Sequence, residues 1–132
     1  MIRPRAAISW SGGKDSLAAV AATRERLDLV CALTMFDESG GRSRSHGLRP
    51  ELVAAQAQRL GLRSVTARCS WSTYNDVFTG ALRTLAQDGI THVVFGQSAR
   101  SRWEILLKGS TLNRFLEEVS GAAVQVVPIE SP

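Results

Sequence analysis

Short apolar runs alternate with amphipathic stretches along the chain, and this alternation predicts its secondary structure. A near-continuous apolar run is typical of a strand that is buried on both faces of a parallel sheet. Apolar side chains at helical spacing, with a capping residue before them and glycine after them, predict amphipathic helices. We expect strands at residues 6–10, 27–36, 64–69, 91–95 and 123–127. We expect helices at 14–26, from Pro50 to Gly61, from a cap at Ser72 or Thr73 to Gly89, and at 110–119.

This order of elements predicts one α/β domain over residues 1–132. Alternation of this kind gives a parallel sheet with helices on both faces. We expect a three-layer α/β/α sandwich of Rossmann-like type, with a five-stranded parallel sheet in the order 3-2-1-4-5. Pro128 suggests that the last strand lies at the sheet edge. Ligands bind such sheets beyond the carboxyl ends of the strands, where the strand order reverses. The loops that begin at Ser11 and Gly96, after the first and fourth strands, should therefore meet at one crevice.

The loop after the first strand reads Ser-Gly-Gly-Lys-Asp-Ser, at residues 11–16. Two glycines let the backbone approach a phosphate closely, and the start of the following helix offers unpaired N–H groups to an anion. The serines add hydroxyl donors, and the lysine adds a positive charge. The aspartate would cap the helix or hold a magnesium ion. The same letters also fit a turn that binds nothing. The candidate phosphate-binding residues are Ser11, Gly12, Gly13, Lys14, Asp15 and Ser16, with Asp15 also the candidate Mg²⁺ ligand.

Composition and charge narrow the class of protein. Hydrophobic residues make up 44% and charged residues 21%, which is ordinary for a soluble globular domain. No apolar stretch approaches the roughly 20 residues of a membrane span, and no signal peptide is evident. Cys31 and Cys69 lie in apolar or strand-like runs and are expected to be buried free thiols, which is typical of a reducing, cytoplasmic compartment.

The chain is basic, with a formal net charge of +4 and a pI near 9.8. A basic surface suits an anionic ligand, either a nucleotide or a nucleic acid. Scattered arginines are better explained as a solvated face. The clustered ones are Arg42, Arg44 and Arg49, followed by Arg100 and Arg102.

Residues 8–96 resemble the diphthine–ammonia ligase type of PP-loop (pyrophosphate-loop) ATP pyrophosphatase. The matching segments are Ser-Gly-Gly-Lys-Asp-Ser at 11–16, Leu-Thr-Met-Phe-Asp-Glu at 33–38, Ser-His-Gly at 45–47, the helix at 52–62, and Thr-His-Val-Val-Phe-Gly at 91–96. Those enzymes bind ATP, adenylate a carboxylate and release pyrophosphate before ammonia attacks. The resemblance implies that the 11–16 loop holds the phosphates, that Thr34 and Phe36 line the adenine, and that His46 lies near the mouth.

Residues 96–127 resemble universal stress proteins, most closely the version in potassium-sensing histidine kinases. The segment from Gly96 to Ser110 is similar to their nucleotide loop, although Ala99 stands where that family has its second glycine. Both families share the HUP fold class, and their combination in one chain favours an engineered chimera slightly over a divergent natural protein. This resemblance implies nucleotide contacts at Gly96, Ser98, Arg100, Gly109 and Ser110.

Three functions remain open at this stage. The first is a domain that binds ATP, ADP or AMP, with Mg²⁺ as a candidate companion and with little or no catalysis. The second is an adenylating ligase in which Lys14 stabilises charge on the α-phosphate and the leaving pyrophosphate. The third, a nucleic-acid-binding module, ranks last because no stripe of stacking aromatics accompanies the arginines. An exposed edge at residues 124–127 also favours a homodimer.

Overall fold

The computed structural model describes residues 2–96, 117–118 and 125–129. The chain confirms the predicted order of elements through its first four strands and three helices. These are β1 (Arg5–Ser9), α1 (Lys14–Thr23), β2 (Asp28–Phe36), α2 (Pro50–Arg59), β3 (Arg63–Arg68), α3 (Tyr74–Gln87) and β4 (His92–Phe95), and they are followed by β5 (Glu117–Glu118) and β6 (Gln125–Pro128).

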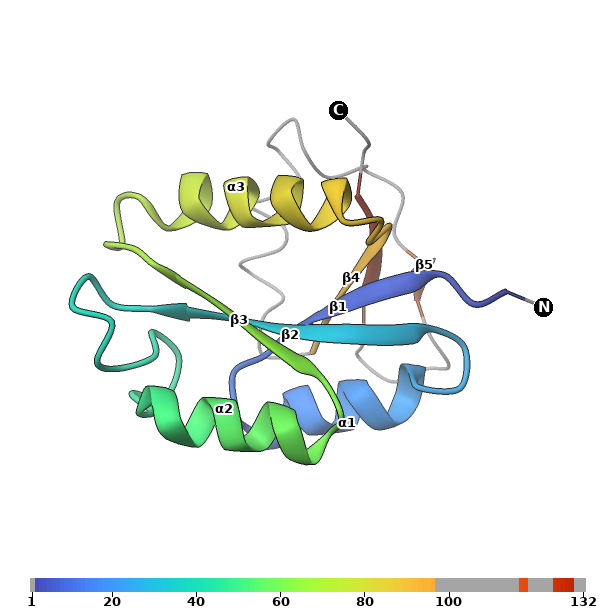
Figure 1. Cartoon of the computed structure of the whole chain (residues 1–132), viewed down its shortest axis with the longest axis horizontal. Coiled ribbons are helices and arrows are strands. Elements are labelled where there is room, and N and C mark those ends of the chain that lie inside the picture. The colour runs from blue at the N-terminus through green and yellow to red at the C-terminus, as the bar shows by residue number, and fades with distance from the viewer. Residues whose placement is uncertain (1, 97–116, 119–124, 130–132) are drawn as a thin grey trace.

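The strands form one sheet in the order β3-β2-β1-β4-β6-β5 (Figure 1). β1, β2, β3 and β4 are mutually parallel, with Ile8 of β1 opposite Ala32 of β2 and Val94 of β4. If β6 is counted as the fifth predicted strand, the order 3-2-1-4-5 is confirmed. The strand order reverses between β1 and β4, so the carboxyl ends of these two strands mark the switch point of the sheet.

The sheet is mixed rather than wholly parallel, which corrects the prediction for the last strand. β6 runs antiparallel to β4, with Val126 opposite Val94, and β5 pairs antiparallel with the other side of β6. β6 is therefore not an edge strand, and the reasoning that favoured a homodimer through it no longer holds. Pro128 is tolerated because it is the last residue of β6, where its missing N–H removes only the end of the ladder.

The helix expected at 110–119 is also wrong at its carboxyl end, because Glu117–Glu118 is strand β5. The helical spacing of apolar residues predicts a helix there. Such local spacing carries no information about the antiparallel pairing of this segment with β6. The rest of that expected helix lies outside the described residues.

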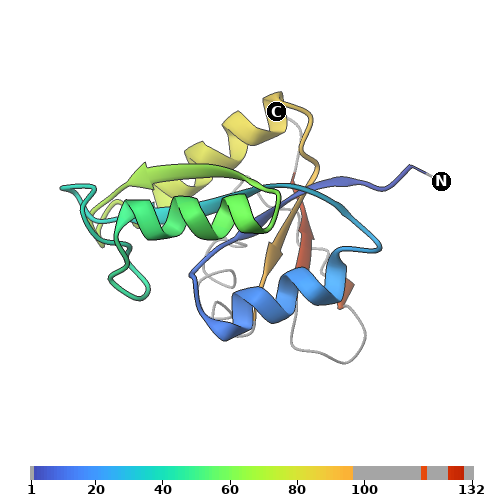
Figure 2. The same cartoon turned by 60° about the horizontal axis from the view of Figure 1, so that its bottom comes forward.

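The helices cover both faces of the sheet, as predicted for a three-layer sandwich. α3 lies on one face, and α1 and α2 lie on the other (Figures 1 and 2). The α3 side buries one apolar cluster and the α1–α2 side a second, so the central strands contribute side chains to both. Cys31 and Cys69 are buried free thiols, as expected. None of the helices in the described part of the chain has the length and apolar character needed to cross a bilayer.

Candidate functional site

The loop between β1 and α1 is closed by its own two serines. The Ser11 and Ser16 hydroxyl oxygens are 2.7 Å apart, and Ser16 Oγ accepts the Ser11 N–H at 3.0 Å. Ser11 Oγ accepts the Gly13 N–H at 3.2 Å. Gly12 adopts a left-handed backbone with φ of 83°, which favours glycine. In this structure the serines shape the loop, and their predicted contact with phosphate stays a prediction.

The amino-terminus of α1 is open at its cap. The N-cap residue, Gly13, has an extended backbone, and no side chain caps the helix. Asp15 is therefore not a cap and lies in the first turn, where its negative charge faces the positive end of the helix dipole. Lys14 is exposed and has no ion-pair partner among the described residues. The helix start thus keeps amides and one cation available to an anion.

The described residues contain no cluster of three or more His, Cys, Asp or Glu side chains that could hold a metal ion. Asp15 therefore belongs to no such cluster in the described part of the chain. Mg²⁺ commonly binds through one or two carboxylates together with substrate phosphates and water. Asp15 fits that role only with a phosphate ligand present.

The end of β4 lies beside the start of α1, as expected from the strand order. Gly96 directly follows β4 and is buried. A Cβ atom on Gly96 would lie 2.8 Å from the carbonyl oxygen of Asp15 and 3.4 Å from the backbone nitrogen of Ser16. The fourth strand therefore ends in direct contact with the first turn of α1. The other predicted residues of that second loop, Ser98, Arg100, Gly109 and Ser110, lie outside the described residues.

A cavity of about 220 Å³ opens where Gly96 lies beside the 11–16 loop. It lies at the carboxyl ends of β1, β2 and β4, and it mixes polar and apolar walls. This volume is below the roughly 300–1,000 Å³ of drug-sized ligand pockets, so the cavity suits part of a nucleotide. Its lining residues are Ser9, Trp10, Ser11, Ser16, Leu33, Met35, Ser45, His46, Tyr74 and Gly96.

The β2 wall of this cavity is offset by one residue from the prediction. Leu33 and Met35 line it, whereas Thr34 and Phe36 do not. Thr34 donates its hydroxyl to the Trp10 carbonyl at 3.0 Å, and Phe36 is buried in the α1–α2 cluster. Successive strand residues point to opposite faces, and an apolar run buried on both faces does not reveal which set faces the cavity.

The loop at residues 37–49 folds back over the end of β2 and supplies the outer wall. The Arg44 backbone N–H donates to the Met35 carbonyl at 2.9 Å. The Arg44 side chain donates from Nε to the Cys69 carbonyl at 3.0 Å, and its guanidinium lies 5.0 Å from the Trp71 ring centroid. Arg44 thereby ties this loop to the β3–α3 connection. His46 lies at the cavity mouth, as the resemblance implied.

Sequence reasoning missed the aromatic wall of the site. Tyr74 lines the cavity and belongs to a ladder of stacked rings formed by Trp71, Tyr74, Phe78 and Phe95, with successive centroids 5.8, 6.1 and 5.9 Å apart. Phe78 is buried in the apolar cluster on the α3 side, and Tyr74 lies four residues before it. Helical spacing could therefore have placed Tyr74 on the same buried face.

A second, larger hollow of about 420 Å³ lies between α1 and α2. Its walls are mainly apolar and include the exposed Leu17 and Leu52, with Lys14 and Arg59 adding positive charge. Trp10, Gly12 and Gly13 also line it, so it borders the 11–16 loop, but none of its described lining residues comes from the ends of β2 or β4. We therefore take the first cavity as the candidate site and call the second the α1–α2 groove.

Asp37 gives the 37–49 loop an acid-sensitive turn. The Ser39 hydroxyl (2.7 Å) is the main cause that lowers the pKa of the Asp37 carboxyl, and the Gly41 N–H (3.2 Å) adds to it. A carboxyl with a lowered folded-state pKa contributes stability above its unfolded pKa and loses it as the pH falls through the folded value.

Asp37→Asn should therefore lose less stability than the parent chain between about pH 6 and pH 3. Denaturant unfolding at both pH values measures this, and Ser39→Ala should give an intermediate result. Identical pH dependence in all three chains would contradict the role of the turn.

Comparison with known proteins agrees with this geometry. A search of curated protein sequences finds no match. A family model described as diphthamide synthase N-terminal domain matches residues 4–112. The match spans β1 to β4 and the 11–16 loop, and it supports the resemblance to PP-loop ATP pyrophosphatases. It gives no support to the universal stress protein resemblance or to a chimera. With most of its length matched and its phosphate-type loop at the switch point of the sheet, the chain belongs to the diphthamide synthase N-terminal domain family.

Proposed function

We propose that the chain binds ATP at the candidate site, with the phosphates on the 11–16 loop and the base in the cavity. The observation that carries this proposal is the contact between Gly96 and the first turn of α1. It joins an uncapped helix start to a cavity at the switch point of the sheet, and a nucleotide needs both a polyanion site and a partly apolar pocket.

The electrostatics of the loop support a polyphosphate. Helix dipole and free amides favour negative charge at the start of α1, and Lys14 adds a full positive charge beside them. Asp15 opposes a bare polyphosphate, and Mg²⁺ bound between its carboxylate and the phosphates would remove that repulsion. ADP and AMP share the base and sugar but carry less charge, so ATP with Mg²⁺ should bind most tightly.

Isothermal titration calorimetry tests the proposal directly. The chain is titrated with ATP, ADP, AMP and adenosine, each with and without Mg²⁺. We expect affinity to fall in that order and Mg²⁺ to strengthen ATP binding more than AMP binding. No heat of binding at millimolar ATP, in either condition, would overturn the proposal.

A second candidate function is adenylation of a carboxylate with release of pyrophosphate. The family match favours it, because the matched domain is named for a synthase. A carboxylate oxygen of the acceptor would attack the α-phosphorus, the bond to the bridging oxygen would break, and pyrophosphate would leave with that electron pair. Ammonia would then displace AMP. Lys14 is the candidate catalytic residue, since its charge would stabilise the leaving pyrophosphate.

Measuring pyrophosphate release separates the two candidates. Release that requires both a carboxylate and ammonia, with one AMP formed for each pyrophosphate, would establish the ligase reaction. If the chain binds ATP but forms no AMP with any carboxylate acceptor tested, it acts as a nucleotide-binding domain.

A further inference from the structure

The side chain of His46 lies directly over the N-cap of α1. Its Nε2 atom is 2.8 Å, and its Cε1 atom 3.5 Å, from the position that a Cβ on Gly13 would occupy. His46 also lines the cavity and is exposed. The imidazole thus occupies space next to the glycine backbone that a phosphate would have to approach.

The imidazole has no hydrogen-bond partner among the described residues, although serines line the same cavity. Nothing in the described part of the chain therefore explains its position through a bond of its own. Its Nε2 faces the phosphate-type loop rather than the apolar core. An imidazole N–H is a hydrogen-bond donor suited to an anionic oxygen.

The backbone on both sides of His46 is anchored. Before it, Arg44 is bonded to the Met35 carbonyl through its N–H and to the Cys69 carbonyl through its guanidinium. After it, the Gly47 N–H donates to the Ser43 carbonyl at 3.1 Å, and the Leu48 N–H donates to the Ser43 hydroxyl at 2.9 Å. Because the segment is already held in place, a ligand pays little conformational entropy to order it, and this favours binding.

We infer that His46 donates a hydrogen bond from Nε2 to a phosphate oxygen of a di- or triphosphate bound over Gly13, and so selects for the length of the phosphate chain. This inference rests on the proposed function and adds a second donor, from a different loop, to the 11–16 site. A chain of two or three phosphates can contact both the α1 amides and His46, whereas adenosine has no group to contact either.

The test uses His46→Ala and His46→Gln, with MgATP, inorganic pyrophosphate and adenosine as calorimetric probes. His46→Ala should weaken MgATP and pyrophosphate binding about tenfold, as expected for one hydrogen bond to a charged group. Adenosine binding should stay within about twofold of the parent. His46→Gln should recover part of the loss, because its side-chain amide can donate from a similar position.

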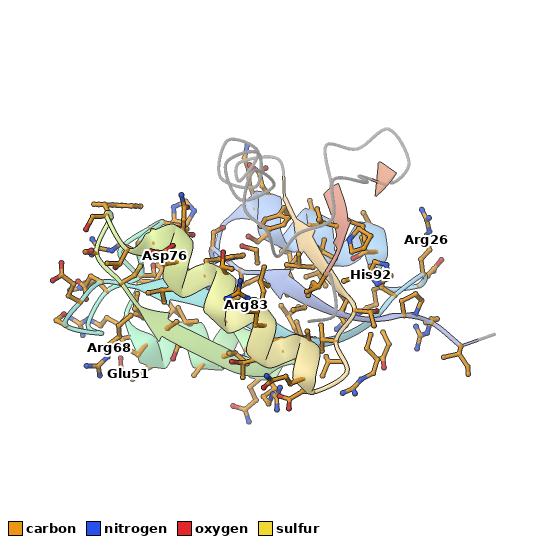
Figure 3. All side chains as sticks on the ribbon, turned by 90° about the horizontal axis from the view of Figure 1, so that it is seen from above. Arg26, Glu51, Arg68, Asp76, Arg83 and His92 are labelled. Carbon is orange, nitrogen blue, oxygen red and sulfur yellow. The ribbon has the colours of Figure 1, made fainter. Side chains whose placement is uncertain are left out.

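His92→Ala is the matched control, because it removes the other histidine of the chain. His92 is the first residue of β4 and lies at the opposite end of that strand from Gly96; Figure 3 labels it. This control should leave the ratio of MgATP to adenosine affinity unchanged. Circular dichroism and thermal unfolding confirm that each variant is folded.

The outcomes separate this inference from the proposed function. If the parent chain binds MgATP but His46→Ala binds it equally well, or loses ATP and adenosine affinity to the same extent, the role of His46 is wrong and the proposed function stands. If the parent chain binds neither MgATP nor pyrophosphate, both are wrong. If His46→Ala loses affinity for MgATP and pyrophosphate but keeps its affinity for adenosine, the inference is supported.

Discussion

Gly96→Ala is expected to remove ATP binding and to destabilise the fold by about 1–3 kcal/mol, the usual range for overpacking a buried site. The added Cβ would lie 2.8 Å from the Asp15 carbonyl oxygen and 3.0 Å from its carbon. These are backbone atoms, so they cannot move aside as the end of a flexible side chain can. The end of β4 and the start of α1 would have to separate, and both walls of the candidate site would shift. Urea unfolding and calorimetry with MgATP measure the two effects.

Gly80→Ala is the matched control for this substitution. Gly80 is exposed within α3, and beyond its chain neighbours and the adjacent helix backbone no atom lies within 4 Å of the position that its Cβ would occupy. Alanine in the interior of an exposed helix is favoured over glycine by about 0.5–1 kcal/mol, so this variant should be more stable and should bind ATP normally. If Gly96→Ala behaved like Gly80→Ala, the end of β4 would not be in contact with the first turn of α1.

Lys14→Ala should weaken MgATP binding about 10- to 100-fold while leaving adenosine binding within about twofold. A hydrogen bond to a charged group is worth about 1.5–3 kcal/mol, and adenosine has no charge for the ammonium group to meet. The unfolding free energy should not change measurably, because Lys14 is exposed and has no ion-pair partner among the described residues. Calorimetry with both ligands gives the ratio of affinities.

Arg59→Ala controls for the loss of positive charge as such. Arg59 lines the α1–α2 groove together with Lys14 but lies in the last turn of α2, outside the 11–16 loop. It should lower MgATP affinity by less than about threefold. Two results would show that Lys14 does not contact phosphate. One is that Lys14→Ala loses MgATP and adenosine affinity to the same extent. The other is that Arg59→Ala lowers MgATP affinity as much as Lys14→Ala does.

The sequence was sufficient for the parallel part of the fold because its signals there are local. Glycines, Pro50 and apolar runs punctuate every element up to β4, and the bounds agree to within a few residues. The meeting of Gly96 with the 11–16 loop followed from strand order alone. The direction of β6 could not be predicted in the same way, because parallel and antiparallel pairing use the same short apolar run.

The walls of the candidate site depend on contacts between distant segments, which no local pattern reports. The choice of Leu33 and Met35 over their neighbours depends on which face of β2 meets the cavity. The position of His46 depends on the bond between Arg44 and the Cys69 carbonyl, 25 residues apart in the chain.

The serines of the 11–16 loop illustrate a different limit. Motif reasoning assigned their hydroxyl groups to the ligand, and the structure shows them bonded to each other and to the loop backbone. A hydroxyl group can both donate and accept, so shaping the loop does not exclude a contact with phosphate. Residue type alone does not tell these two roles apart.

The central claim is that the 11–16 loop and the cavity beside Gly96 form one nucleotide site. A crystal structure of the chain with Mg²⁺ and a non-hydrolysable ATP analogue tests it most directly. We expect phosphates at the amino-terminus of α1 and the base in the cavity lined by Met35, Tyr74 and Gly96. A nucleotide with its base in the α1–α2 groove, or with its phosphates away from Gly13 and Lys14, would contradict it.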